Sequence, residues 1–478
     1  MPRSIPMVVM VITQIENRRR VENLRSLYST VLFAVTILLS TFVSMGYHYI
    51  HHADATTTTD DTTDTDLSYE AEANDQPIIT DPNLEVKQVV EGLELPTSMA
   101  FLGPDDILIL EKDNGILHRI VNGKMLPEPL LDVNVANENE RGMLGIAVAK
   151  SETSTYVFAY FTESIVDGND DCPTVSRCNP GNEPLGNRLY RYELVDNKLV
   201  NPQLLLDLPA TPGPGHNGGA IMIGPDNNLY VPIGELLQPG LQKGLSRADG
   251  RGGILKVTQN GEAVVGLGGE GILGNTYPLD LYYAYGIRNS FGIDFDPVTG
   301  KLWDSENGPK KGDEINLVEP GFNSGWNKVA GMWPRKGDSS SDIVLNPDNL
   351  FDFGGKAKYS TPEFSWFNTV GPTAVKFLNS DKLGAQYVND MFVGDVHNGN
   401  LYHFDLNEDR TELVLQEPLV DKVTEDDAEN EAIIFGEGFG GITDIEVGPD
   451  GYLYVVSIGL GKIFKIVPKV NNNNGEVE

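Results

Sequence analysis

The sequence predicts an all-β fold, a six-bladed β-propeller with long loops, and its recurring patterns carry that prediction. Between residues 83 and 469, short apolar strands alternate with turns rich in Gly, Asp and Pro, without a convincing long amphipathic helix. A Gly followed within three residues by Leu or Ile recurs at positions 115, 186, 253, 399 and 461. The intervals are 71, 67, 146 and 62 residues, so the long interval fits two units.

A second pattern, a turn followed by a strand, recurs as GPDDILIL, GPDNNLYV, DPVTGKLW and GPDGYLYV. Its Asp residues are separated by 121, 70 and 154 residues, which are again multiples of a similar length. Six slots of roughly 60–75 residues result, and fixed-period repetition is typical of propellers and solenoids. The period exceeds a compact four-stranded blade, so long loops between strands are expected.

The N-terminal part predicts a membrane segment. Residues 1–26 carry Arg at positions 18, 19, 20 and 25 and form the expected basic cytoplasmic segment. Residues 27–50 contain an apolar run long enough to span a bilayer as a transmembrane helix or signal anchor. The basic flank orients everything that follows to the outside of the cytoplasm. The alternative is a cleaved signal peptide, with Ala53-Asp54-Ala55 as the cleavage site, which would give a secreted protein.

Two further segments are predicted to be disordered, and the net charge limits the kinds of partner that the protein can bind. Residues 51–82, rich in Thr and Asp, are predicted to be a disordered linker, and residues 470–478 a disordered tail, because neither has enough apolar residues to form a core. The chain has 35 Lys and Arg against 69 Asp and Glu, a net charge of −34. Such a surface repels nucleic acid, which excludes that class of partner.

The two cysteines, Cys172 and Cys178, are separated by five residues in a stretch rich in Pro, Asp and Asn. A zinc site would need four ligands at tighter spacing. In the oxidising compartment that the N-terminus implies, this spacing predicts a small disulfide that closes a loop.

The densest group of polar side chains lies between Gly286 and Trp326, in GIRNSFGIDFDPVTGKLWDSENGPKKGDEINLVEPGFNSGW. Arg288 offers a planar fork of donors for carboxylates or carbonyls. The turn Asn307-Gly308-Pro309 can expose consecutive carbonyls, which suit Ca²⁺. The alternative for any one of these elements is an ordinary β-hairpin with solvated charges. Together they favour a site for an anionic ligand and a hard cation.

Of the seven histidines, His216 is the strongest candidate for chemistry. His48, His51 and His52 flank the membrane segment, and His118 and His403 lie in strand patterns, where packing or surface roles are expected. His216 lies in the Gly-rich turn TPGPGHNGGAIMIGPDNNLYV just before a strand, where the backbone can approach a ligand closely.

These motifs resemble the soluble quinoprotein (PQQ-dependent) glucose/sorbosone dehydrogenase family over about Leu84 to Pro468. The specific string is RN…ENGP…GDEINL…NSGW, supported by HNGG and by ENERGMLGIAV. The resemblance implies a six-bladed propeller that oxidises the anomeric hydroxyl of aldose sugars to lactones. It implies hydride transfer to pyrroloquinoline quinone, with His216 as general base. An electron acceptor at the membrane is the partner that this reaction would need.

The resemblance also implies roles for individual residues. Arg288 would stabilise charge on the reduced quinone, and Glu140, Asn289 and His397 would join it around the cofactor. The carbonyls of Gly308 and Pro309 would hold a Ca²⁺ that also binds the cofactor, and Glu314 would belong to a second, structural Ca²⁺ site.

Several positions depart from the family pattern, most of them by losing a charged or polar side chain. His397 stands where a cofactor-binding Lys is usual, and the other departures are Ala220, Glu235, Ile287, Gly441 and Thr443. Two further functions therefore stay open from the sequence. One is a Ca²⁺-dependent lactonase on the same scaffold, and the other is a non-catalytic surface propeller that binds glycans or proteins.

Overall fold

The computed structural model describes residues 76–165, 183–238, 248–334 and 349–470. The chain divides into a unit of residues 1–62, outside the described ranges, and a unit of residues 63–478 that contains every described element. The predicted membrane segment over 27–50, both cysteines and nearly all of the predicted linker and tail lie outside the described residues. Within those ranges, no helix has the length and apolar character needed to cross a membrane.

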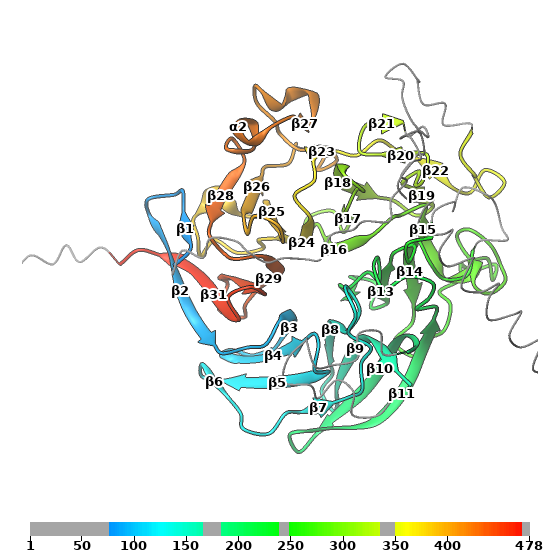
Figure 1. Ribbon diagram of the computed structural model, residues 1–478, viewed down its shortest axis with the longest axis horizontal. Coiled ribbons are helices and arrows are strands. Elements are labelled where there is room, and N and C mark those ends of the chain that lie inside the picture. The colour runs from blue at the N-terminus through cyan, green and yellow to red at the C-terminus, as the bar shows by residue number, and fades with distance from the viewer. Residues whose placement is uncertain (1–75, 166–182, 239–247, 335–348, 471–478) are drawn as a thin grey trace, which may run out of the picture. The chain divides into compact units, whose positions relative to one another are not determined.

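The described residues form six sheets of four or more strands and one two-stranded sheet (Figure 1). The first sheet follows the N-terminal strands and the second follows it directly in the chain. The first contains β3 (Pro96–Gly103), β4 (Asp106–Glu111), β5 (Ile116–Val121), β6 (Lys124–Met125) and β7 (Leu131–Asp132). The second contains β8 (Met143–Lys150), β9 (Thr155–Ser164), β10 (Pro184–Val195) and β11 (Lys198–Leu208).

The strands of the third and fourth sheets are not in simple sequence order. β19 and β22 follow β18 in sequence but pair in the third sheet. The third contains β12 (Met222–Ile223), β13 (Leu229–Ile233), β14 (Gly253–Val257), β15 (Tyr282–Tyr285), β19 (Phe322–Asn323) and β22 (Lys358–Tyr359). The fourth contains β16 (Ser290–Phe295), β17 (Leu302–Glu306), β18 (Lys311–Val318), β23 (Phe364–Asn368) and β27 (Val423–Thr424). The two-stranded sheet contains β20 (Val329–Ala330) and β21 (Trp333–Pro334).

The last two sheets each take one strand from the N-terminal end of the described chain. The fifth contains β24 (Pro372–Phe377), β25 (Met391–Asp395), β26 (Leu401–Phe404), β28 (Ile434–Glu437) and β1 (Ile78–Ile79). The sixth contains β29 (Ile442–Val447), β30 (Leu453–Ser457), β31 (Lys462–Pro468) and β2 (Leu84–Glu91). Helical structure in the described ranges is limited to single turns, η3 (Leu279–Leu281), η5 (Ala385–Tyr387), η6 (Leu419–Asp421) and α2 (Asp427–Asn430).

Strands of successive sheets contact one another in turn, mostly through the first strand of each sheet, and the cycle closes on itself. β3 contacts β8, β8 contacts β12, β13 contacts β16, β16 contacts β24, β24 contacts β29, and β29 contacts β3 again. The apolar core lies between neighbouring sheets, as where Leu108 and Leu117 of the first sheet pack with Ile146 and Phe161 of the second. Each sheet is therefore covered on both faces, and the all-β, propeller-like class predicted from the sequence is confirmed.

The predicted boundary between linker and domain at Asn83 is wrong. Ile78 and Ile79 form β1 and pair antiparallel with Glu437 and Gly436, and Thr80 donates its backbone N–H to the Phe435 carbonyl. A two-residue strand that pairs with a segment distant in sequence leaves no periodicity, so composition alone assigned these residues to the linker.

Candidate active site

His216 lies in the loop before β12, with its backbone in the left-handed region at φ 62° and its side chain buried. Its Nδ1 is 2.6 Å from Oε1 of Glu235, which lies two residues after the end of β13. Its backbone N–H donates to Oε2 of Glu140 over 2.6 Å. Two carboxylates therefore hold this histidine, one at the ring and one at the main chain.

Glu140 joins the His216 loop to the loop between β15 and β16. The same Oε2 accepts a hydrogen bond of 3.0 Å from Nδ2 of Asn289. Oδ1 of Asn289 accepts a 3.3 Å bond from the backbone N–H of Gly218. The structure thus brings together three of the residues predicted from the sequence, although they come from the entries to three different sheets.

Gly234 allows this close approach. A Cβ at this position would lie 2.4 Å from the His216 carbonyl, 2.7 Å from the Arg288 carbonyl and 2.8 Å from Oδ1 of Asn289. Contacts below 3 Å to backbone atoms cannot be relieved by side-chain motion. Any larger residue would separate the loop of His216 from the loop of Arg288.

A buried amide network fixes the residue after His216. Oδ1 of Asn217 accepts a 3.0 Å hydrogen bond from Nδ2 of Asn187, and its carbonyl accepts a 2.9 Å bond from the Tyr160 hydroxyl. All three side chains are fully buried. In a low-dielectric interior such satisfied networks favour one conformation, so they hold the loop that carries the histidine.

Arg288 is buried and stacked, with its guanidinium carbon 5.4 Å from the Trp326 ring centroid. Its Nη1 donates to the Asn307 carbonyl over 3.0 Å, and its backbone N–H donates to Oε1 of Glu306 over 2.6 Å. Within the described residues its buried Nε has no hydrogen-bond partner. A spare donor on a permanent cation is suited to bind an anionic ligand.

An acidic cluster lies next to Arg288 on the facing strands β17 and β18, where Glu306 pairs with Glu314 in the ladder. Burial raises the pKa of Glu306 to about 7, although the N–H of Arg288 and the hydroxyl of Ser324 oppose the shift. Burial, followed by the charge of Glu306, raises the pKa of Glu314, and the same two causes raise that of Asp304. These carboxyls therefore retain protons at a pH at which exposed acids are ionised.

Glu314, predicted as a ligand of a structural Ca²⁺, is engaged in hydrogen bonds. Its carboxylate accepts bonds from the backbone N–H of Gly331, from Nδ2 of Asn316 at 3.1 Å and from the Ser324 hydroxyl at 3.3 Å. The group has a structural role as it stands, holding the segment after β19 against β18.

The Gly308-Pro309 turn, predicted from the resemblance to hold Ca²⁺, is held in place by Asp313. The backbone N–H of Gly308 donates to Oδ1 of Asp313 over 2.7 Å, and Oδ2 of Asp313 accepts from the N–H groups of Val370 and Gly371. No hydrogen bond from the described part of the chain reaches the carbonyl oxygen of Gly308 or Pro309. Both residues are half-buried, so these oxygens fit a hard cation such as Ca²⁺.

Asp313 connects this turn with His397. Gly371, which donates to Asp313, lies so close to His397 that a Cβ on it would be 3.1 Å from the imidazole Nε2. His397 is exposed, and its Nδ1 is 3.5 Å from the Thr369 carbonyl. The imidazole is therefore available at the edge of the site.

Three residues at the site had no role assigned to them from the sequence. Glu235 and Asp313 position His216 and Gly308, and Arg251 is a buried cation whose pKa is raised by its bond to Asp249 and, more weakly, by the charge of Glu235. Among the described residues, Nη1 of Arg251 has no hydrogen-bond partner. The only available signal was Glu235, an acidic residue shortly after the strand that follows HNGG.

The described residues thus combine a closed cycle of sheets with a buried histidine–carboxylate pair in its loops and a stacked arginine beside it. The chain belongs to the Glucose / Sorbosone dehydrogenase family, whose model matches residues 93–465. It is therefore an enzyme of the dehydrogenase type, and the non-catalytic alternative is set aside.

The chain is similar in sequence to relatives with known names and similar in fold to a solved structure. The aldose sugar dehydrogenase YliI of Escherichia coli is 25% identical over 394 residues, covering 81% of this chain and 93% of the relative. Quinoprotein glucose dehydrogenase B of Acinetobacter calcoaceticus is 28% identical over 272 residues, covering 52% of this chain and 53% of the relative. A solved structure of the PQQ-bound aldose sugar dehydrogenase of Streptomyces coelicolor superposes with a TM-score of 0.57 at 23% identity, covering 82% of this chain and 100% of that one.

Proposed function

We propose that the protein is a PQQ-dependent aldose dehydrogenase that oxidises the anomeric hydroxyl of a sugar to a lactone. The observation that carries the proposal is the buried His216–Glu235 pair, held 2.6 Å apart in the loop network that also contains Arg288. The family match and the PQQ-bound relative support the cofactor class.

In this proposal His216 is the general base, and the contact with Glu235 supports that role. An ionised Glu235 accepts a hydrogen bond from Nδ1–H, which leaves the lone pair of the neutral imidazole on Nε2. Nε2 then takes the proton of the anomeric hydroxyl as the carbon–hydrogen bond breaks. Glu235 stabilises the imidazolium that results, because its negative charge lies at the opposite ring nitrogen.

The residues present fit the cofactor and its cation. When bound, PQQ supplies a quinone that accepts the hydride. Arg288, with its unpartnered Nε, and the exposed His397 would hold its anionic groups, and the Gly308 and Pro309 carbonyls would hold Ca²⁺. Asn289 and Glu140 would act by fixing the loops around them. Positions 441 and 443, which depart from the family pattern, add no cation to the site. Residue 441 is Gly, and the Thr443 hydroxyl donates to the Pro96 carbonyl.

The proposal is tested by titrating the purified protein with PQQ in the presence of Ca²⁺ while following cofactor absorbance. Saturable binding together with aldose-dependent reduction of a dye is the expected result. Since a missing charge-assisted hydrogen bond weakens binding by about 1.5–3 kcal/mol, we expect weaker PQQ binding than in relatives with more cations. A flat absorbance response up to millimolar PQQ would overturn the cofactor assignment.

We propose further that the six larger sheets are the blades of one six-bladed propeller. The cyclic contacts of their first strands support this, as do the recurring Gly and Asp positions. An electron-density map of the crystallised protein, in which six blades are counted directly, tests it.

The location outside the cytoplasm is also a proposal, supported by the arginine-rich flank and the apolar run in residues 27–50. On that proposal the segment anchors the protein beside a membrane-bound electron acceptor, and Cys172 and Cys178 form a disulfide. The anchored protein should stay in the membrane pellet after carbonate washing. A mature N-terminus just after Ala55 would show cleavage instead, and mass spectrometry without reductant tests the disulfide.

A further inference from the structure

A second group of potential metal ligands lies in the fifth sheet, on the hairpin of β25 and β26. Asp390 directly precedes β25, whereas His403 lies in β26 and Asp405 follows it. His403 and Asp405 are two residues apart, so their side chains lie on the same face of the strand. Because β25 and β26 are antiparallel, with Phe392 opposite His403, Asp390 reaches the same place from the neighbouring strand.

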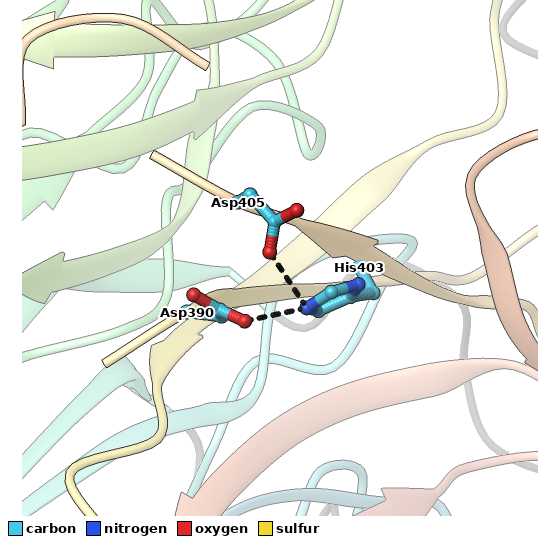
Figure 2. Close-up of side chains that lie close together, drawn as sticks. All are labelled: Asp390, His403 and Asp405. Atoms are coloured by element: carbon cyan, nitrogen blue, oxygen red, sulfur yellow. Dashed lines mark hydrogen bonds and ion pairs between the residues drawn. The ribbon is translucent and has the colours of Figure 1, made fainter. Parts of the chain in front are cut away.

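Both carboxylates face one ring nitrogen. Nε2 of His403 is 2.9 Å from Oδ2 of Asp390 and 3.8 Å from Oδ1 of Asp405, as Figure 2 shows. The three ligand atoms all lie within 4.8 Å of one another, and in the described ranges no other group of His, Cys, Asp and Glu meets that condition.

The imidazole is held in this orientation by aromatic rings. Its centroid lies 5.3 Å from that of Tyr387, 5.1 Å from that of Phe392 and 5.9 Å from that of Phe435. Because these contacts already restrict the imidazole, Nε2 is oriented before a cation binds and little further side-chain freedom is lost. Such preorganisation lowers the entropic cost of binding a cation.

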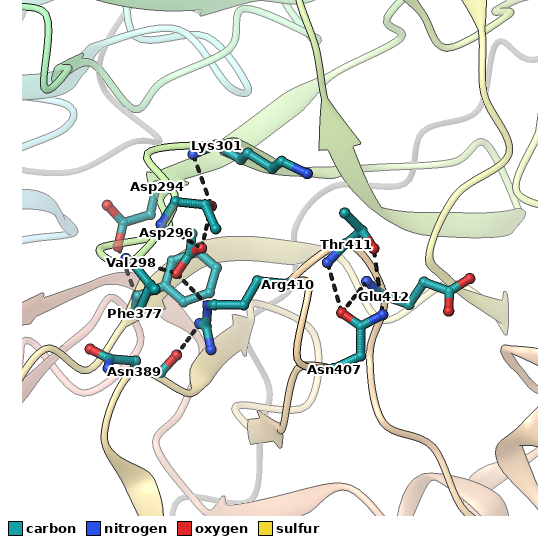
Figure 3. A network of polar contacts seen from close by, with 11 residues as sticks. Asp294, Asp296, Val298, Lys301, Phe377, Asn389, Asn407, Arg410, Thr411 and Glu412 are labelled. Carbon is teal, nitrogen blue, oxygen red and sulfur yellow. Dashed lines mark hydrogen bonds and ion pairs between the residues drawn. The ribbon is translucent and has the colours of Figure 1, made fainter.

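Among the residues that the structure describes, no Lys or Arg pairs with either aspartate. In the described part of the chain, the only ion pairs of Asp390 and Asp405 are with His403. The nearby Arg410 is committed elsewhere, since its Nε pairs with Asp296 at 2.7 Å and its Nη2 donates to the Asn389 carbonyl (Figure 3).

We propose that Asp390, His403 and Asp405 bind a single divalent transition-metal ion of the Zn²⁺ type. Imidazole with two carboxylates suits such borderline ions better than Ca²⁺ or Mg²⁺, which prefer oxygen alone. Bonds of about 2.0–2.2 Å place tetrahedral ligands roughly 3.4 Å apart, between the two spacings observed. Asp405 is exposed, so water completes the coordination from the solvent side.

The site is distinct from the active site. Asp390 precedes the first residue of β25, whereas His397 follows its last residue, Asp395, so the two lie beyond opposite ends of the strand. The metal would join the start of β25 to the end of β26 and stabilise the hairpin. It would leave the Gly308-Pro309 turn free for Ca²⁺.

The test uses the full-length protein with His48, His51 and His52 replaced by Ala, because these three histidines would bind transition metals themselves. After chelation and exchange into excess Ca²⁺, the protein is titrated with Co²⁺, followed by its visible absorption, and with Zn²⁺, followed by calorimetry. We expect one equivalent to bind with a Co²⁺ spectrum of low coordination number, and Zn²⁺ to displace it.

His403→Gln and Asp405→Asn should each weaken Zn²⁺ binding by at least 10-fold, whereas Asp409→Asn, an exposed acid outside the group, should leave it unchanged. Unchanged far-UV circular dichroism establishes that the variants fold, and the exposure of Asp405 makes its variant the safer of the two. Absence of Co²⁺ and Zn²⁺ binding, or equal binding in the variants, would show a histidine–carboxylate hydrogen-bond group only and overturn the proposal.

Discussion

Nδ1 of His216 lies 2.6 Å from Oε1 of Glu235, and both side chains are almost completely buried. The Glu235 N–H in turn donates to the Arg288 carbonyl over 2.9 Å. The residue that orients the proposed base is thus fixed to the residue that would hold the cofactor. A substitution that moves Glu235 or Arg288 should therefore also shift the other residue.

His216→Gln should reduce kcat for aldose oxidation by about 10²–10⁴-fold, the usual contribution of a general base, and leave PQQ affinity nearly intact. Steady-state kinetics and an absorbance titration measure the two quantities. His118→Gln is the matched control, because His118 also contacts a glutamate, 3.2 Å from Glu111, but in the first sheet. Equal rates for wild type and His216→Gln would show that another group takes the proton.

Glu235→Gln should lower kcat by about 10²–10⁴-fold with little change in KM, because an amide does not fix the tautomer or stabilise the imidazolium. A structural role alone would not predict a selective effect on kcat. Glu235→Asp keeps the charge and should recover part of the rate. If the Gln variant were as fast as the Asp variant, the carboxylate would have no part in proton transfer.

Gly234→Ala should destabilise the protein by about 1–3 kcal/mol and abolish most activity, because the new methyl would overlap three atoms of the site. Denaturant unfolding and kinetics measure the two effects. Gly103→Ala is the control, since a Cβ there would meet nothing within 4 Å and its φ is not positive. Wild-type stability in Gly234→Ala would mean that the loops are not in this close contact.

Ionisation of Glu306 should lower the free energy of unfolding of the Ca²⁺-free protein as the pH rises. Its pKa is 4.5 as a reference value and about 7 in the fold, so between these values the native state binds more protons than the unfolded state. The stabilisation is fully present below pH 4.5 and lost as the pH passes 7. Between pH 5 and 8 the loss is on the order of 1–3 kcal/mol. Urea unfolding at both pH values should show this slope in the wild type and a smaller one in Glu306→Gln; a larger slope in the variant would contradict it.

Removal of Ca²⁺ should lower Tm, because the Gly308 and Pro309 carbonyls lose their proposed ligand. A Ca²⁺ concentration of 100 times Kd would contribute about 2.7 kcal/mol of stability. Differential scanning calorimetry of His403→Gln, with and without a Ca²⁺-selective chelator, separates this effect from the second metal site. A Tm indifferent to Ca²⁺ in that variant would count against the turn as a cation site.

The repeating framework was predictable because it is encoded locally. Asp105, Asp226, Asp296 and Asp450 all lie at or next to the turn between the first and second strands of a sheet, as the recurring GPD and DPV strings indicated. The recurring glycines lie one or two residues before a third strand (115, 399 and 461) or in such a strand (186 and 253). Turn chemistry and alternation act over a few residues, so one chain displays them.

The site was predictable only where a motif named a residue. His216, Glu140 and Asn289 meet as expected, but the bond from His216 to Glu140 spans 76 residues and the bond from Asn289 to Glu140 spans 149. Which carboxylate lies beside His216 depends on how two loops pack, and local pattern does not contain that information. Local pattern likewise does not reveal that the two-residue strands β19 and β22 pair in the preceding sheet.

β2 pairs antiparallel with β31, from Leu84 opposite Pro468 to Glu91 opposite Lys462, so the sixth sheet is made from both ends of the domain. During synthesis β2 emerges early and has no partner until β31 leaves the ribosome. The ring of sheets therefore closes only after translation of the domain is complete, and until then an apolar strand edge is exposed to other chains.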